Sequence, residues 1–405
     1  MRLVILTSRF PSPPNQGDKL RILQQLKVLS EKHEICLIAV NKGEIKAEDW
    51  AVVAPYCKEI HVFKNTLFDL GLNTIRAFFK GIPLQVGVFF KPLHHRKMTD
   101  IIKAFQPDAL YCHLIRMTEY CREIKGIPKT LDFMDVFSMG AKRWYQTAQW
   151  YLKPILAMEY RRLCAYEKAV FEEFDHKTII TEQDRDLIPH PNFNKIHVIP
   201  NGVDFGEFHP QAAEKKYDLL YMGYMGYAPN IEAACYFVEK VMPLLLKQRP
   251  NLKLLIAGHT PHKRVLALAS HSVDVKPDWK YISDSFIISR VMVAPMLISI
   301  GLQNKIIQAM AMKTPTVCSR LANNAVKAPA SCIIEADSPE EYVAAIFKLL
   351  DTPQYYNEIA ENAYKFVHEN FDWHKTTNKL ERIIFSTAHL KQLKQNEICD
   401  TKPVV

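Results

Sequence analysis

The 405-residue sequence lacks long apolar runs, paired cysteine motifs and a dinucleotide-binding fingerprint. No stretch approaches the roughly 18 apolar residues of a membrane-spanning helix, and the opening MRLVILTSRFP lacks the regions of a signal peptide. The nine cysteines are scattered without a CxxC pair or a nearby histidine at metal-ligand spacing, so we expect reduced thiols in a cytoplasmic protein. The missing GxGxxG argues against a nicotinamide oxidoreductase, and no motif supports nucleic-acid binding.

Acidic residues are scarce relative to basic ones, chiefly in the first half. The net charge is +9, and the first 200 residues hold 29 Lys and Arg against 22 Asp and Glu. Such a surface suits an anionic partner, such as lipid headgroups or a phosphorylated acceptor, or it serves solubility alone. Between residues 76 and 97, basic side chains alternate with Phe78, Phe79, Phe89 and Phe90. This pattern fits peripheral contact with the anionic inner face of a membrane, or a basic surface over an aromatic core.

Strands and helices alternate along the whole chain. A strand, a glycine-bearing loop and an amphipathic helix open the sequence, and the same alternation restarts at YDLLYMG, after the charged segment 212–216 that resembles a linker. We therefore expect an α/β protein with two Rossmann-like domains facing across a cleft. The predicted domains cover residues 1–205 and 206–375, and a terminal helix at 376–395 packs back on the first domain. Pro154 should kink or split the long helical region 142–174.

One stretch, residues 294–319, has the pattern of an anion site. A buried strand breaks at Gly301, a helix follows, and TPTVCS re-enters a strand. A glycine turn before a helix directs backbone N–H groups and the positive end of the helix dipole at an anion. Lys305, in the first turn, adds a cation. We interpret this segment as a diphosphate site.

The first half offers its own candidate residues at the carboxyl ends of predicted strands. Gly17 and Arg21 follow the first strand, and His113 ends the strand PDALYCH. In parallel sheets these ends face the ligand cleft, although a lone histidine is more often structural. Asp132 and Asp135 lie in an apolar strand and need partners, which a ligand, a metal ion or a neighbouring helix can supply. Their spacing is not the DxD that chelates a metal beside a diphosphate, and a structural role is favoured slightly.

Four segments together resemble a known family. They are KIHVIPNGVDFGEFHP, YDLLYMGYMGYAPNIEAACYF, TLDFMDVFS and APMLISIGLQNKIIQAMAMKTPTVCS. The chain resembles GT-B glycosyltransferases of the group 1, family 4 type, and is similar to the sugar transferases of exopolysaccharide and exosortase (PEP-CTERM) systems. The resemblance covers about residues 1–380.

The resemblance implies a retaining transfer of a sugar from a nucleotide-sugar donor to a glycan or lipid-linked acceptor, in cell-surface polysaccharide synthesis. It implies no metal ion and no cofactor besides the donor. His113 and Lys305 are the implied catalytic residues. The implied donor-binding residues are Gly17, Arg21, Gly223, Gly226, Gly301, Leu302, Gln303, Asn304 and Gln308.

The chain departs from the family at two positions. Members commonly carry two glutamates eight residues apart, where this sequence has Ile300 and Gln308. A glutamine can still hold a ribose hydroxyl, but a carboxylate accepts hydroxyls more strongly. Two alternatives therefore stay open: a non-catalytic GT-B scaffold or partner subunit, and a nucleotide-sugar 2-epimerase.

Overall fold

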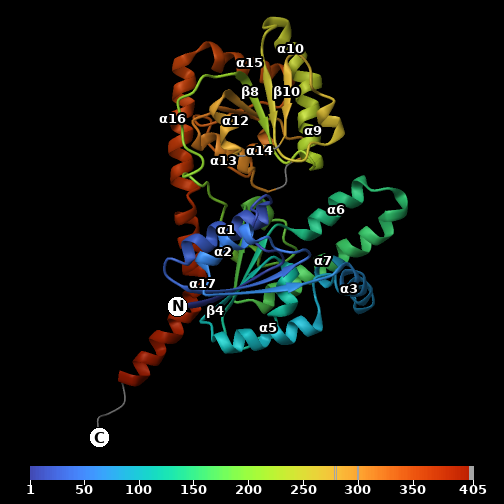
Figure 1. Ribbon diagram of the computed structural model, residues 1–405, viewed down its shortest axis with the longest axis vertical. Helices are drawn as coiled ribbons and strands as arrows, with labels where there is room; N and C mark the ends of the chain where they lie inside the picture. Colours follow the sequence, from blue (N-terminus) through green and yellow to red (C-terminus); the bar gives the residue numbers. More distant parts are fainter. Residues whose placement is uncertain (278, 280, 299–300, 401–405) are drawn as a thin grey trace. The chain divides into compact units, whose positions relative to one another are not determined.

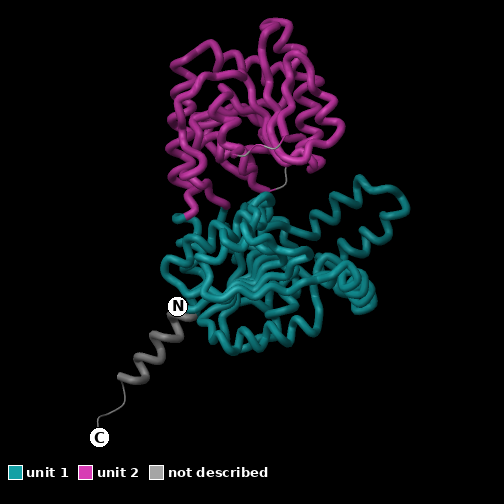
Figure 2. The backbone as a smooth tube through the Cα atoms, in the orientation of Figure 1, with its two compact units in different colours: residues 1–200, 374–405 teal, residues 201–373 magenta. Residues whose placement is uncertain are grey.

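The computed structural model describes residues 1–277, 279, 281–298 and 301–400, with side chains up to residue 387 (Figure 1). It forms two compact units, shown in different colours in Figure 2. Unit 1 comprises residues 1–200 and 374–405, and unit 2 comprises residues 201–373. The sequence suggested divisions at 205/206 and 375/376. Segment 212–216, expected as the linker, lies inside unit 2.

Unit 1 is built on a parallel sheet of order β3-β2-β1-β4-β5-β6-β7. Its strands are β1 (Arg2–Thr7), β2 (Glu34–Asn41), β3 (Glu59–Lys64), β4 (Ala109–His113), β5 (Lys129–Met134), β6 (His176–Ile179) and β7 (His197–Val198). Its helices are α1 (Gly17–Leu29), α2 (Ala47–Val53), α3 (Leu67–Lys80), α4 (Leu84–Gly87), α5 (Pro92–Phe105), α6 (Phe137–Thr147), α7 (Lys153–Glu173) and α8 (Glu182–Arg185).

Unit 2 repeats this plan with a parallel sheet of order β10-β9-β8-β11-β12-β13. Its strands are β8 (Tyr217–Met222), β9 (Leu254–Ala257), β10 (Val273–Lys276), β11 (Ser289–Ala294), β12 (Thr316–Cys318) and β13 (Ile334–Glu335). Its helices are α9 (Ala228–Tyr236), α10 (Met242–Gln248), α11 (Lys263–Leu266), α12 (Ser283–Ile287), α13 (Asn304–Ala311), α14 (Arg320–Asn323), α15 (Pro339–Asp351) and α16 (Pro353–Asn370).

Both sheets reverse their strand order at one place, between β1 and β4 in unit 1 and between β8 and β11 in unit 2. The loops that leave the two central strands there diverge to opposite faces of the sheet. They open a crevice at the carboxyl ends of the strands, which is where ligands bind in doubly wound folds. The expectation of two Rossmann-like domains is confirmed.

The chain passes between the units at two adjacent points. Val203 donates its backbone N–H to the carbonyl of Phe371 at 2.7 Å and forms a β-bridge with Asp372. A Cβ at Gly202 would lie 2.6 Å from the backbone nitrogen of Trp373, so only glycine fits there. The two segments are therefore fastened together at the end of unit 2.

The terminal helix α17 (Trp373–Asp400) returns to unit 1. Leu380, Ile384 and Phe385 are fully buried in the core that includes Ile5 and Leu26. On the surface, Glu381 accepts hydrogen bonds from Lys32 and bonds to His33, both at 2.9 Å.

Pro154 does separate two helices. The region expected as one long helix is a hairpin of α6 and α7, joined by a short 3-10 turn, Trp150–Leu152. Pro154 lies in the first turn of α7, where a proline costs no hydrogen bond. The hairpin extends from unit 1 in Figure 1. Among the described residues, no helix is both long enough and apolar enough to cross a membrane.

Candidate functional site

The best-formed candidate site lies in unit 2 around Lys305, in the first turn of α13. Its side chain is only 7% exposed. The ammonium donates to Oδ1 of Asn230 at 2.7 Å, lies 3.6 Å from the sulfur of Met296, and sits 5.0 Å from the centre of the Tyr221 ring. All these neighbours are neutral, and among the described residues no carboxylate pairs with Lys305. Burial lowers its pKa from 10.5 to about 7.

Glycines bring the backbone up to this ammonium. A Cβ at Gly223, directly after β8, would lie 3.3 Å from Nζ of Lys305 and 2.9 Å from Nδ2 of Asn230. A Cβ at Gly258, after β9, would lie 1.8 Å from the carbonyl oxygen of Gly223. Substitution at either position would displace the turn, because space there is already filled by backbone or by the Asn230 amide.

Gly301 forms the turn that precedes α13. Its φ is 64°, in the left-handed region that favours glycine. Leu302 and Gln303 follow and are half-buried, and Leu302 packs against the core of unit 2. Asn304 begins the helix and accepts a hydrogen bond from Nδ2 of Asn201 at 3.4 Å. The loop thus carries the helix N-terminus, with its N–H groups and positive dipole end, to the carboxyl ends of β8 and β11.

Two other predicted positions lie near this centre. Gln308 is half-buried, three residues after Lys305 on α13. Gly226 lies in the turn before α9, where a Cβ would meet the ring of Tyr224 at 3.2 Å. Ile300, the other departure from the family pattern, lies outside the described residues.

Unit 2 therefore combines a buried cation, a helix N-terminus and glycine turns at the point where its strand order reverses. A cation that has lost its hydration without gaining a carboxylate is costly to bury, and an anionic ligand offsets that cost. The arrangement suits a diphosphate. The sequence pattern indicated Gly223 and Lys305. It did not indicate the contacts of Tyr221 and Met296, nor Gly258, for which a glycine directly after a strand was the available signal.

Arg21, which the family resemblance places among the donor-binding residues, is enclosed in unit 1. Its side chain is fully buried, and Nε donates to Oδ2 of Asp132 at 2.7 Å. Asp132 also accepts from the hydroxyls of Tyr111 at 2.7 Å and Thr178 at 3.0 Å. Burial lowers the pKa of the guanidinium, but the charges and hydrogen bonds of Asp132 and Tyr111 together outweigh burial and raise the pKa. Arg21 is an internal ion-pair partner, and the structural interpretation of Asp132 is confirmed.

His113 lies beside this ion pair, at the end of β4. It is fully buried, and among the described residues neither ring nitrogen has a hydrogen-bond partner. Burial lowers its pKa to about 4, so the ring is neutral at pH 7. A buried imidazole with two unused nitrogens loses hydrogen-bond energy, which a ligand hydroxyl can restore.

The backbone around His113 is strained. Leu114 follows it with φ 68°, and Met134 ends β5 with φ 58°. Left-handed conformations cost residues other than glycine about 1–3 kcal/mol, and they cluster at functional sites. Gly17 lies close by, since a Cβ there would be 3.5 Å from Cε of Met134.

Arg116 is a further cation near these residues, and no sequence pattern indicated it. Its guanidinium lies over the rings of Phe137 at 4.8 Å and Phe89 at 5.2 Å. Burial lowers its pKa to about 10. Its Nε has no hydrogen-bond partner among the described residues, so the group can receive an anion at the carboxyl end of the unit 1 sheet.

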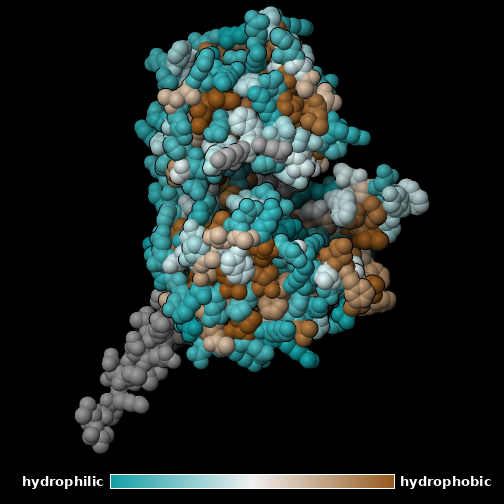
Figure 3. Space-filling model, in the orientation of Figure 1, coloured by the Kyte–Doolittle hydropathy of each residue, from teal (hydrophilic) through white to brown (hydrophobic). Residues whose placement is uncertain are grey.

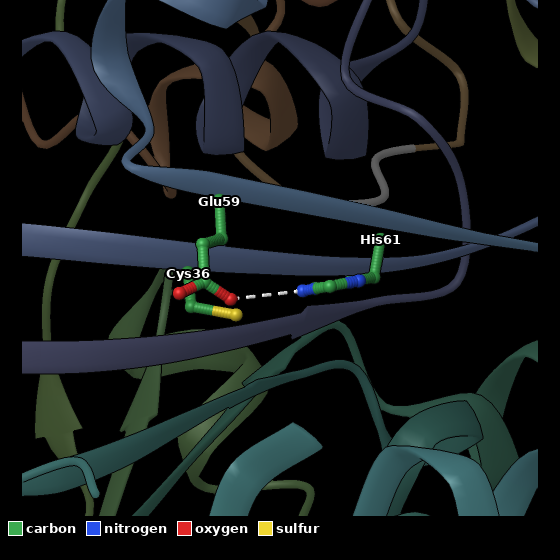
Figure 4. Close-up of side chains that lie close together, drawn as sticks. All are labelled: Cys36, Glu59 and His61. Carbon is green, nitrogen blue, oxygen red and sulfur yellow. Dashed lines mark hydrogen bonds and ion pairs between the residues drawn. The ribbon is translucent and has the colours of Figure 1, made fainter. Parts of the chain in front are cut away.

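A third cluster has the residue types of a metal site (Figure 4). The ligand atoms of Cys36, Glu59 and His61 lie within 4.8 Å of one another. His61 and Glu59 already bond to each other at 3.0 Å, and burial, followed by Glu59, raises the pKa of the Cys36 thiol to about 12. Cys36 and Glu59 pair near the amino ends of β2 and β3, opposite the crevice. These three side chains are of the types that bind zinc, but they lie away from the candidate ligand site.

Two hollows in the described part of the chain lie away from these residues. The larger, of about 490 Å³, lies at the amino end of β5 beside Lys129 and the end of α7. The smaller, of about 200 Å³, lies between Arg290 and the start of α16. Neither includes a residue of the Lys305 site or the His113 group.

Parts of this chain are similar to proteins that are already known. The pattern of the family "Glycosyl transferases group 1" matches residues 216–352, entirely within unit 2. An "Uncharacterized 44.6 kDa protein in cps region" of Klebsiella pneumoniae is 22% identical, over 94% of this chain and 98% of the relative.

Solved structures share the fold over nearly the full chain. Sucrose-phosphate synthase of Thermosynechococcus elongatus is 14% identical, covers 99% of this chain and 100% of its own, and superposes with a TM-score of 0.67. The Anabaena protein HepE, solved in complex with UDP, is 12% identical, covers 95% of this chain and 100% of its own, and has a TM-score of 0.66. HepE was also solved with UDP-glucose.

Proposed function

We propose that this chain, which has the GT-B fold and carries a group 1 glycosyltransferase domain in unit 2, transfers a sugar from a nucleotide sugar to a glycan or lipid-linked acceptor. The observation that carries the proposal is the buried ammonium of Lys305, held by neutral groups at the start of α13. The donor diphosphate would supply the missing negative charge. The complexes of HepE with UDP and UDP-glucose support a uridine nucleotide as the first donor to test.

The reaction we propose breaks the bond between the anomeric carbon and the diphosphate. Negative charge grows on the leaving diphosphate, and the Lys305 ammonium and the helix N-terminus stabilise it. The acceptor hydroxyl attacks the anomeric carbon from the same face, and its proton passes to the leaving phosphate oxygen. Configuration is then retained, and neither a side-chain base nor a metal ion is required.

We assign His113 a contact with a donor-sugar hydroxyl. A neutral imidazole with two unused nitrogens can both donate and accept, and its pKa near 4 keeps it neutral at pH 7. Gly17, at the start of α1, would let backbone approach the same ligand. The variant His113→Ala should lose donor turnover while it keeps its folded structure, and this result would support the role.

The chain's place in the cell is part of the same proposal. We expect a cytoplasmic enzyme of cell-surface polysaccharide synthesis, and the relative from a cps region supports this setting.

The direct test is a ligand screen followed by a transfer assay. Thermal shifts with UDP, GDP, ADP and dTDP should reveal one base that raises the melting temperature, because a ligand that binds the native state stabilises it. Nucleotide sugars of that base should then be hydrolysed slowly, and transferred when an acceptor is added. Product NMR separates transfer from 2-epimerisation. If no nucleotide shifts the melting temperature, the proposal fails.

A non-catalytic scaffold is the second candidate, and Gln308 favours it. The family's carboxylate is absent at a half-buried position one turn from Lys305. A scaffold would bind nucleotide without turning over the sugar. Gln308→Glu distinguishes the two, since a weakened enzyme should gain activity and a scaffold should not.

A further inference from the structure

Helix α3 presents most of its large apolar side chains to the outside of unit 1, while Leu70 and Leu72 are half-buried. The exposed fractions are 86% for Leu67, 79% for Phe68, 56% for Ile75 and 82% for Phe79. The buried positions of the same helix are Asn73 and Ala77, each 2% exposed. This is the reverse of the usual surface helix, whose apolar face packs on the core.

The contacts beneath α3 prevent it from rolling its apolar face inward. A Cβ at Gly87 would lie 2.3 Å from Cβ of Ala77, so α3 and α4 meet at closest approach there. The Asn73 amide donates to the carbonyl of Val88 at 3.3 Å. Thr66 and Asp69 form a capping box that fixes the helix start. The apolar face is thus held outward by packing on the other side.

The α6–α7 hairpin carries a second exposed apolar group. Its members and exposed fractions are Trp144 (58%), Trp150 (81%), Tyr151 (59%) and Ile155 (52%). α7 also touches α3, since Arg162 donates to the carbonyl of Phe78 at 2.9 Å and lies over the Phe78 ring at 5.4 Å. Figure 3 shows apolar surface over both elements, on the same side of unit 1. We call the exposed residues of α3 and of the hairpin the apolar face.

Positive charge accompanies the apolar face. Residues 137–158 of the hairpin contain Lys142, Arg143 and Lys153 and no acidic residue. On α3, Arg76 and Lys80 are exposed, and the one acidic residue, Asp69, is bonded to Lys91 at 2.7 Å. Tryptophan, tyrosine and phenylalanine flanked by lysine and arginine are the composition that binds the interface of an anionic bilayer.

We propose that unit 1 docks on an anionic lipid bilayer through this apolar face, with the aromatic rings of α3 and of the hairpin tip at the headgroup level. The contact is interfacial, since none of the described helices can span a bilayer. A protein partner fits less well, because protein interfaces are depleted of lysine at their centres, and Lys80, Lys142 and Lys153 stand among these aromatics. The sequence pattern of Phe78, Phe79, Phe89 and Phe90 fitted either membrane contact or a basic surface over an aromatic core; Phe79 is exposed, whereas Phe89 is 5% exposed and belongs to the core.

The proposal goes beyond sugar transfer and does not depend on it. Co-sedimentation of the full chain with vesicles of phosphatidylcholine and phosphatidylglycerol in equal parts should show binding, with much weaker binding to phosphatidylcholine alone. The double variants Phe68→Ser/Phe79→Ser and Trp150→Ser/Tyr151→Ser should each weaken binding about tenfold or more, because they remove apolar contact with the lipid. Leu266→Ser in unit 2, at a side chain 48% exposed, is the matched control and should bind normally.

Charge variants separate the electrostatic contribution to lipid binding from the apolar contribution. Lys142→Gln and Lys153→Gln should each lower affinity for the anionic vesicles about fivefold, with little effect on binding to neutral ones. Lys247→Gln, at an exposed position of α10, controls for net charge. Every variant should retain the wild-type melting temperature and its shift with nucleoside diphosphate. Failure of vesicle binding with an intact nucleotide shift would overturn the docking proposal alone.

Two outcomes contradict the proposal. One is no binding of the wild type to anionic vesicles at low salt. The other is a concentration-dependent dimer that Phe68→Ser/Phe79→Ser abolishes, which would make the apolar face a protein interface.

Discussion

The two units bury a cation in opposite ways. In unit 1, Arg21 is fully enclosed, and Asp132 neutralises it at 2.7 Å. In unit 2, Lys305 is almost as deeply enclosed and meets an amide oxygen, a sulfur and an aromatic ring. The environments drive the pKa values apart: that of Arg21 is raised, and that of Lys305 falls to about 7. A compensated cation stabilises its own unit, whereas an uncompensated one favours a ligand.

The largest effect should come from removing the counter-charge in unit 1. Asp132→Asn leaves the guanidinium of Arg21 buried without a carboxylate, and such a loss costs about 3–5 kcal/mol of unfolding free energy. Urea unfolding measures it. Asp351→Asn, which removes a partly exposed partner of Arg249, is the control and should cost less than about 1 kcal/mol. Equal effects of the two variants would contradict the assigned role of Asp132.

Next in size is the loss of the unpaired cation in unit 2. Lys305→Met should leave the melting temperature unchanged or higher, because it removes an uncompensated buried charge. It should weaken binding of the cognate nucleoside diphosphate about tenfold or more and slow transfer about a hundredfold. Lys313→Met, at a residue half-buried beside Glu361, is the matched control. Destabilisation by Lys305→Met with unchanged nucleotide affinity would argue for a structural lysine.

The pH dependence of unit 2 should follow the same amine. The ammonium of Lys305 titrates near pH 7 in the free protein, so nucleotide affinity should fall above pH 7, by at most about tenfold per pH unit. Binding should take up a proton, which calorimetry in two buffers of different ionisation enthalpy detects. Unfolding free energy should rise between pH 7 and 10.5, because the unfolded chain keeps the proton that the folded one has released. The variant Lys305→Met should lose the pH dependence of nucleotide affinity above pH 7 and the rise in unfolding free energy between pH 7 and 10.5.

The smallest effect is the gain from Gln308→Glu. A carboxylate accepts ribose hydroxyls more strongly than an amide, and we expect donor affinity to rise about fivefold. Gln248→Glu, exposed at the end of α10, is the control for added charge. A donor Kd that does not change would show that Gln308 does not reach the ribose.

Sequence patterns predicted the architecture well, since alternation of strands and helices determines a doubly wound sheet. Pro154 located the break between α6 and α7, and Gly301 and Lys305 located the start of α13. These features are local, so a single stretch of sequence contains them.

The contacts that decide the role of each residue are long-range. Arg21 and Asp132 are 111 positions apart, and Lys305 and Asn230 are 75 apart. Nothing in the sequence around Arg21 distinguishes an internal ion pair from a ligand contact. The inverted amphipathicity of α3 was hidden for the same reason, because a helical pattern shows that one face is apolar and not which face meets the core.

The return of α17 to unit 1 has a consequence for synthesis. Residues 201–373 are continuous, so unit 2 contains all of its own chain once residue 373 has left the ribosome. Unit 1 lacks Leu380, Ile384 and Phe385 until that part of α17 emerges, and its core beside Ile5 stays open until then. Although it is translated first, unit 1 is the second to be completed, which reverses the usual N-terminal-first order of domain folding.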